Sequence, residues 1–167
     1  MINESNKEPL KSSGMNEHFN FFIKSIPDHL EIAKKWLDKE KLSYSYKEID
    51  EVGKIYKKLF KKSKKKGKWY DEKYEVFITY CGEAWIKYFF GKWELNTYKK
   101  TYGYGNPMVM NYGPKDYHWS ALDFERWLRY IEEGDKDALS LPYSRTVNYF
   151  YKTPEWEFDP LKNLNDE

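Results

Sequence analysis

The sequence predicts a single α+β domain in which helices pack around a central apolar helix, beside a small antiparallel β-hairpin or sheet. Three observations predict this class. The chain has 167 residues, enough for one domain to bury its own core, and 20% of them are aromatic. The stretch from Tyr74 to Phe90 is apolar around most of a helical circumference. Two short segments with strand character follow it, joined by a glycine-bearing loop.

Polar segments flank this domain at both ends. We expect residues 1–18 to form a mobile polar tail, residues 19–153 to form the domain, and residues 154–167 to form an acidic C-terminal tail. The N-terminal residues lack the apolar core of a secretory signal. No run approaches the roughly 20 apolar residues of a membrane span. These features predict a cytoplasmic protein without a membrane partner.

Two amphipathic helices are expected before the central one. Asp28 and Glu31 have the spacing of a capping box, which predicts that a helix begins there. The apolar segment 19–23 before it is expected to dock as a short strand or a helical turn. Ser45 and Glu48 repeat the capping signature, so a second helix is expected to follow them.

The central helix carries one narrow polar stripe. Its polar side chains recur at every fourth position, so they lie on one line along the helix: Glu75, Thr79, Glu83 and Lys87. Nearly all other positions are apolar or aromatic. We therefore expect neighbouring elements to cover this helix on several sides, up to a break at Gly91-Lys92.

A hairpin and two further helices complete the predicted fold. Apolar and polar residues alternate over 93–98, which predicts a half-buried strand, and residues 108–112 are expected to form its partner. The apolar face of residues 122–131 predicts a helix that ends before Gly134. Residues 142–151 are expected to form a last short helix.

No pattern typical of catalysis or of cofactor binding stands out. Cys81, the single cysteine, lies in the apolar helix, which disfavours a thiolate and indicates a buried thiol. Metal binding requires clustered histidine, cysteine or carboxylate side chains, and the pair Asp116 and His118 is too small a set. The sequence therefore predicts no enzymatic activity, no metal and no cofactor.

Glu83 is the strongest candidate for a polar residue with a role of its own. We expect Glu83 and Lys87 to be partly buried and to pair with each other one turn apart. The alternatives are that Glu83 caps a backbone group or acts as an acid or base in a cleft. Gly82 precedes it and lets another element approach the helix closely.

A lysine-rich run offers an alternative function. Lys57–Lys68 holds eight lysines in twelve residues, which could contact the phosphates of a nucleic acid. The net charge of the chain is only +2, and arginine occurs at only three positions. Association with a nucleic acid is therefore the alternative function that the sequence predicts, after binding to a protein.

Aromatic residues outside the helices favour a protein partner instead. Tyrosine and tryptophan supply a large contact area at a small cost in entropy, so protein interfaces are rich in them. Several lie in or beside the predicted hairpin and are our candidate partner-binding residues: Tyr98, Tyr102, Tyr104, Tyr112, Tyr117 and Trp119.

The chain also resembles a recurring type of bacterial domain. The pattern is Gly82-Glu83 on a helix, a break and Trp93 opening a strand, a second strand over 106–112, and a helix over 124–134. Over residues 27–150 it resembles small cytosolic bacterial α+β domains of the toxin-system immunity-protein type. The resemblance implies a non-enzymatic protein that neutralises a cognate bacterial toxin by direct binding. Immunity proteins against nucleases are often strongly acidic and this chain is not, so mimicry of a nucleic acid is not implied.

Overall fold

Five helices and a three-stranded antiparallel sheet make up the described part of the chain. The computed structural model describes residues 12–62, 71–101, 103–114, 120–122 and 124–158. The elements in chain order are α1 (Ser12–Leu37), α2 (Tyr46–Lys62), α3 (Glu72–Phe89), β1 (Lys92–Leu95), β2 (Pro107–Met110), β3 (Ala121–Leu122), α4 (Phe124–Glu132) and α5 (Leu141–Tyr151). The predicted α+β class is confirmed.

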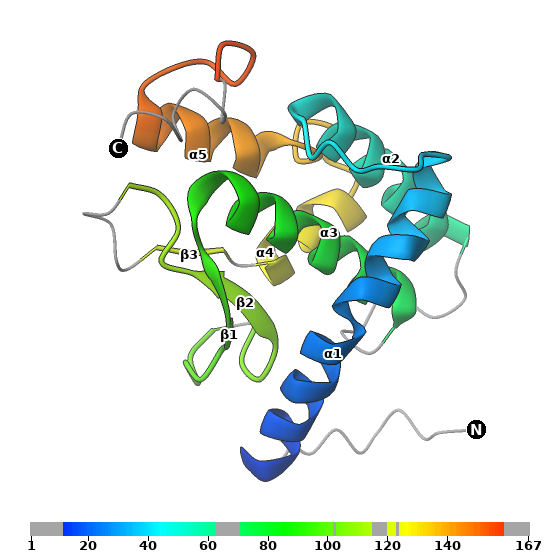
Figure 1. Cartoon of the computed structure of the whole chain (residues 1–167), viewed down its shortest axis with the longest axis vertical. Coiled ribbons are helices and arrows are strands. Elements are labelled where there is room, and N and C mark those ends of the chain that lie inside the picture. Colours follow the sequence, from blue (N-terminus) through cyan, green and yellow to red (C-terminus); the bar gives the residue numbers. More distant parts are fainter. Residues whose placement is uncertain (1–11, 63–70, 102, 115–119, 123, 159–167) are drawn as a thin grey trace.

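Helix α3 lies at the centre of the molecule, as predicted. Figure 1 shows it in the middle, with α1 along one side and the sheet below it. It contacts α1, α2 and β2, and most of its residues are buried. Phe77 and Trp85 both pack against Trp127 of α4, with ring centroids 5.4 Å apart in each pair. Because neighbours cover α3 on several sides, its almost wholly apolar composition is explained.

Helix α1 begins earlier than the sequence predicts. It starts at Ser12 and continues through Pro27, so the helix start expected at Asp28 is wrong. Residues 12–18, expected in the N-terminal tail, form its first turns, while residues 1–11 lie outside the described part. Met15 and Phe22 are buried, and this burial of apolar surface offsets the backbone hydrogen bond that Pro27 cannot donate.

Helix α2 begins at the predicted capping signature, but only one of the two capping-box hydrogen bonds forms, because Ser45 N donates to Ser43 Oγ and not to the Glu48 carboxylate. Glu48 N donates to Ser45 Oγ over 3.3 Å, and the Glu48 carboxylate reaches back to accept from Ser43 N and Tyr44 N, each at 2.9 Å. The carboxylate is 1% exposed and also accepts from the Tyr80 hydroxyl of α3 over 2.9 Å. Burial by itself would raise the pKa of Glu48, but these hydrogen bonds hold it below its ordinary value. Glu48 therefore ties α2 to α3.

The sheet has the order β1-β2-β3, with both pairs antiparallel. Lys92 pairs with Met110 and Leu95 with Pro107, so the predicted hairpin is confirmed. Both strands end sooner than their patterns indicate. The sequence did not predict β3, whose two residues are too few to show an alternating pattern.

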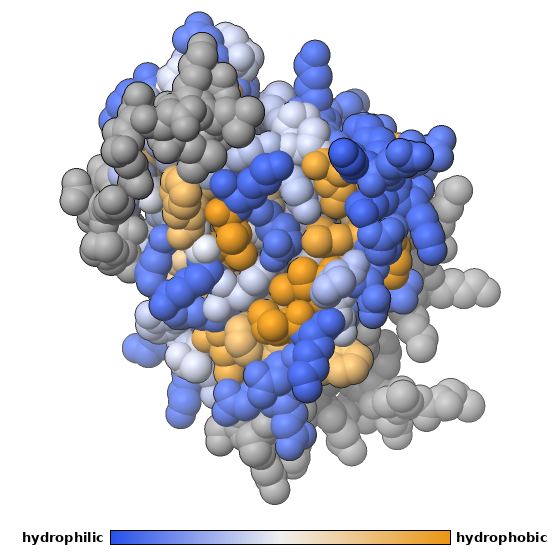
Figure 2. Space-filling view, in the orientation of Figure 1, coloured by the Kyte–Doolittle hydropathy of each residue, from blue (hydrophilic) through white to orange (hydrophobic). Residues whose placement is uncertain are grey.

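Apolar side chains reach the surface in small groups. Figure 2 shows them toward the middle of one face, with hydrophilic side chains around them. Large exposed apolar residues are spread over several elements: Phe21, Phe90, Tyr98, Tyr130, Tyr149 and Trp156. Isolated exposed apolar residues are ordinary on protein surfaces. Hydropathy alone therefore does not mark a binding site on this surface, and surface shape and charge are needed as well.

Candidate partner-binding site

The loop between β1 and β2 holds Tyr98 in an exposed position. Asn96 N donates to Asn106 O over 2.9 Å, and Gly105 N donates to Asn96 O over 2.8 Å. The Asn96 side chain braces the loop, because its Oδ1 accepts from Tyr98 N and its Nδ2 donates to Thr101 Oγ1, each at 3.0 Å. Tyr98 is 56% exposed. The loop therefore presents an aromatic side chain from a hydrogen-bonded frame.

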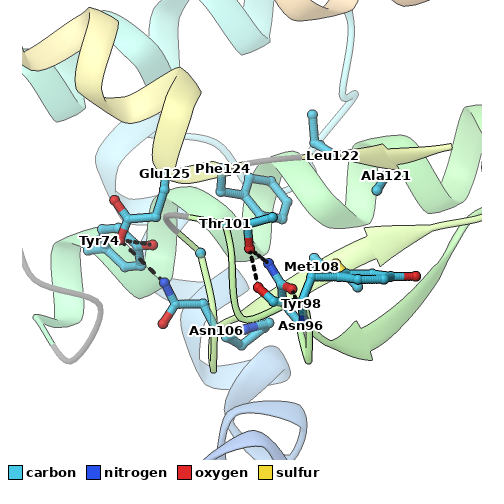
Figure 3. Close-up of a pocket in the computed structure, with 12 residues that line it drawn as sticks. Tyr74, Asn96, Tyr98, Thr101, Asn106, Met108, Ala121, Leu122, Phe124 and Glu125 are labelled. Atoms are coloured by element: carbon cyan, nitrogen blue, oxygen red, sulfur yellow. Dashed lines mark hydrogen bonds between the residues drawn. The ribbon is translucent and has the colours of Figure 1, made fainter. Parts of the chain in front are cut away.

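A cavity of about 90 Å³ lies between this loop, β3 and the start of α4, as Figure 3 shows. Glu125 Oε1 accepts from Tyr74 OH over 3.2 Å and from Asn106 Nδ2 over 3.3 Å. The second contact sets the orientation of the Asn106 amide, since the reverse orientation would place two oxygens together. Asn106 is 5% exposed, and its Oδ1 has no partner among the described residues. The cavity wall therefore presents acceptors suited to a hydrogen-bond donor.

Two larger hollows adjoin this cavity along the exposed side of α4. The first, of about 560 Å³, shares Thr101 and Glu125 with the cavity. The second, of about 340 Å³, lies between α4 and α5 and shares Arg126 and Tyr130 with the first. We name the three adjoining hollows the α4 groove. Tyr130 is 41% exposed, so it stands with Tyr98 as one of two exposed tyrosines on this surface.

The amphipathic character of α4 produces this surface. Phe124, Trp127, Leu128 and Ile131 are buried against the core. The exposed side of the helix presents Arg126, Arg129 and Tyr130 to the groove. Trp127 Nε1 donates to Ala138 O over 2.7 Å, which anchors the segment leading into α5 against α4. The floor of the groove is thus built from buried, well-packed elements.

Charge is distributed unevenly along the α4 groove. All three arginines of the chain line it: Arg126, Arg129 and Arg145. Arg129 Nε lies 3.1 Å from Glu133 Oε1, and Glu125 lies at the hairpin end. In the hollow between α4 and α5, the charged lining residues are Arg126 and Arg145. One end of the groove therefore carries mixed charge, and the other carries positive charge.

The structure separates the six aromatic residues predicted to bind a partner. Tyr98 is exposed and lines the 90 Å³ cavity. Tyr104 and Tyr112 are half-buried. Tyr112 lines the hollow beside α5, and burial raises the pKa of its phenol to about 12. Tyr102, Tyr117 and Trp119 lie outside the described residues.

Sequence reasoning missed four residues of this surface: Arg126, Arg129, Tyr130 and Arg145. All four belong to expected helices, where exposed polar positions carry no special signal. One signal was available. Arginine is rare in this chain, whose 29 basic residues are otherwise lysines, and two arginines lie in one helix. The fold was needed to bring Arg145 of α5 beside that helix.

The expected pairing of Glu83 with Lys87 is wrong, and Lys87 is exposed rather than partly buried. Glu83 Oε1 accepts a hydrogen bond of 2.7 Å from Trp93 Nε1 of β1 instead. The Lys87 ammonium lies over the rings of Tyr44 and Tyr88, 5.4 and 5.5 Å from their centroids. Trp93 is the better partner for Glu83, because its half-buried indole N–H would otherwise lose its hydrogen bond to water. Glu83 therefore has a structural contact that accounts for its position.

The other half of the polar stripe meets two histidines of α1. His18 Nε2 lies 3.5 Å from Glu75 Oε1, and His29 Nε2 lies 3.4 Å from Glu75 Oε2. His29 Nδ1 lies 3.1 Å from Thr79 Oγ1. The order hydroxyl, imidazole, carboxylate matches that of a nucleophilic triad. Thr79 is 0% exposed, however, so no substrate reaches its hydroxyl. This cluster joins α1 to α3.

The thiol of Cys81 is equally enclosed. Burial raises the pKa of the Cys81 thiol well above its ordinary value, which argues against a thiolate there. Among the described residues, no group of three or more histidine, cysteine or carboxylate side chains could hold a metal ion. Asp116 and His118 lie outside that part of the chain, as do residues 63–68 of the lysine run.

Comparison with known proteins adds no assignment. None of the helices in the described ranges combines the length and the apolar composition needed to cross a bilayer. No protein-family model, curated protein or solved structure matches this chain.

Proposed function

We propose that this protein is a non-enzymatic protein-binding module, and that it acts as an immunity protein that neutralises a cognate bacterial toxin by direct binding. The observation that carries the proposal is the α4 groove, a surface of three adjoining hollows with exposed Tyr98 and Tyr130 and all three arginines. Tyrosine and arginine are the residue types enriched where proteins bind one another.

The buried state of the reactive groups supports a binding role. The Thr79 hydroxyl and the Cys81 thiol are both 0% exposed, and Glu83 is occupied by the Trp93 indole. A substrate that reached Thr79 or Cys81 would have to displace packed core. The exposed groups of the α4 groove, in contrast, suit recognition of a surface.

The immunity role rests on the sequence pattern from Gly82 to Gly134. Such a protein would block the active site of the toxin or hold the toxin in an inactive conformation. The α4 groove is our proposed contact surface, since it contains the exposed Tyr98 and the half-buried Tyr112 of the predicted set.

Co-expression tests this function directly. The toxin candidate is the product of the adjacent gene, expressed with and without this protein and followed by cell survival and by co-purification. We expect protection together with a stable complex. Unprotected cells and no complex would exclude the immunity role.

A further inference from the structure

The hollow between α4 and α5 combines two guanidinium groups with an apolar floor. Its charged lining residues are Arg126 of α4 and Arg145 of α5. Arg145 is exposed and forms no ion pair with any described residue. The apolar floor includes Leu122, Trp127 and Leu141. A volume of about 340 Å³ accommodates one or two side chains of a partner.

Arginine indicates the chemistry of the group that this hollow receives. A guanidinium presents a planar set of donors that matches a carboxylate with two parallel hydrogen bonds, which a lysine ammonium cannot do. The chain uses lysine for nearly all its basic positions, yet arginine occupies both charged positions of this hollow. The apolar floor beside the arginines suits an aliphatic or aromatic side chain.

The charge at the other end of the α4 groove, near the hairpin, favours a protein partner over a nucleic acid. Glu125 and Glu133 line this end, and Glu125 shares the small cavity with the unpartnered Oδ1 of Asn106. Lys100 and Arg129 line the same hollow, so its charge is mixed, whereas a nucleic-acid site follows the phosphates with a groove of positive charge. A protein segment meets both ends, because acidic, basic and apolar side chains can follow one another along it.

We propose that the hollow between α4 and α5 binds an aspartate or glutamate side chain of the protein partner, with an adjacent apolar side chain on the floor formed by Leu122, Trp127 and Leu141. This inference rests on the proposed function and names the chemistry of the partner segment. Arg126 and Arg145 hold the carboxylate, and the exposed Tyr130 ring flanks it.

Small probes test the chemistry without the partner. Phenylacetate, phenethylamine and phenethyl alcohol have the same ring and differ in charge. Each is titrated into the full chain and followed by nitrogen–proton correlation NMR. We expect saturable shifts with phenylacetate at Leu122, at Thr146 and at the indole of Trp127. Equal responses to all three probes, or no saturable response to phenylacetate, would overturn the proposal.

Two double variants locate the effect. Arg126→Gln with Arg145→Gln should weaken phenylacetate binding by about tenfold or more. Lys58→Gln with Lys61→Gln removes the same charge from exposed positions of α2 outside the hollow and should change binding little. An equal loss in both variants would show a general charge effect and overturn the proposal. Arg145→Lys, which keeps the charge, supplies a milder variant if the double arginine variant fails to fold.

The toxin complex separates this inference from the function on which it rests. Weaker toxin binding by the double arginine variant, with unchanged binding by the lysine variant, is the expected result. A toxin complex that forms equally with both variants overturns the inference and leaves the proposed function in place. The absence of any complex with the wild-type chain overturns the proposed function itself.

Discussion

The indole ring of Trp93 lies directly against Gly82, where an added β-carbon would stand 2.2 Å from Trp93 Cη2. This close approach lets the indole N–H reach Glu83 Oε1. The same ring packs edge-on against Phe22 of α1 and stacks on Phe124 of α4, with centroids 5.0 and 5.9 Å away. One side chain of β1 therefore contacts three helices.

Gly82→Ala is expected to destabilise the fold by about 2 kcal/mol. Alanine favours helices over glycine by about 1 kcal/mol, but the new methyl group would overlap an indole that is held on several sides. Urea denaturation followed by circular dichroism measures the change. Trp93→Leu should cost less in the Gly82→Ala background than in the wild type, because the smaller side chain makes room for the methyl group. An alanine variant as stable as the wild type would contradict this packing.

Glu83 is expected to contribute to stability through its oxygen acceptor rather than through its charge. Glu83→Ala leaves the Trp93 N–H without its acceptor and should cost about 1–2 kcal/mol. Glu83→Gln keeps an oxygen at that position and should cost clearly less. Denaturant titrations of both variants measure the difference. Equal losses would show that the negative charge, and not the hydrogen bond, is what matters.

The sequence predicted the interior better than the surface. The apolar pattern of α3, the helix start after Ser45 and the close approach at Gly82 are local signals, and all three are confirmed. Each signal depends only on residues that are close in the sequence or on the regular spacing of apolar side chains along a helix. The start of α1 was missed, because Pro27 and a capping signature at Asp28 outweighed the buried positions upstream.

The candidate site depends on contacts between distant segments, which one sequence does not reveal. Tyr98 was predicted from its place in the hairpin. Tyr130 and Arg145 line one hollow only because α4 packs beside β3 and α5 in the folded chain. His18 and His29, which lie eleven residues apart on α1, both contact Glu75 because α1 packs along α3. No spacing rule connects residues so far apart.

Acid should destabilise the protein in two steps. Burial lowers the pKa of His18 from 6.5, although Glu75 partly opposes the shift. Since the unfolded chain takes up this proton first, stability falls as the pH drops below about 7. Glu48 has a folded-state pKa below its ordinary 4.5, so its contribution is present above that pH and is lost as the pH falls further.

Variants assign the two steps. His18→Gln should remove the upper one, and Glu48→Gln should remove the lower one while reducing stability at neutral pH. Unfolding free energies measured by urea titration between pH 3 and pH 8, over about ten values, give both profiles. An unchanged upper step in His18→Gln would assign it to another group.

Alkali should also unfold the protein. Burial raises the pKa of Tyr44 and of Tyr112 to about 12, and burial raises those of Tyr56 and Tyr80 as well. The unfolded chain releases these protons near pH 10, so stability is lost as the pH rises above that value. Tyrosinate absorbance should rise in two phases, the second coinciding with loss of helical circular dichroism. A single phase with a retained helical signal would contradict the burial of these phenols.

The most direct test of the account is the affinity of the cognate toxin for three forms of this protein, measured by isothermal titration calorimetry. Tyr98→Ser with Tyr130→Ser removes both exposed tyrosines of the α4 groove. Tyr149→Ser removes a tyrosine of α5 that is 50% exposed, between the values of Tyr98 and Tyr130, and that does not line the groove. We predict that the wild type and Tyr149→Ser bind alike and that the groove variant binds at least about a hundredfold more weakly. Wild-type affinity in the groove variant would contradict the assignment of the α4 groove as the binding surface.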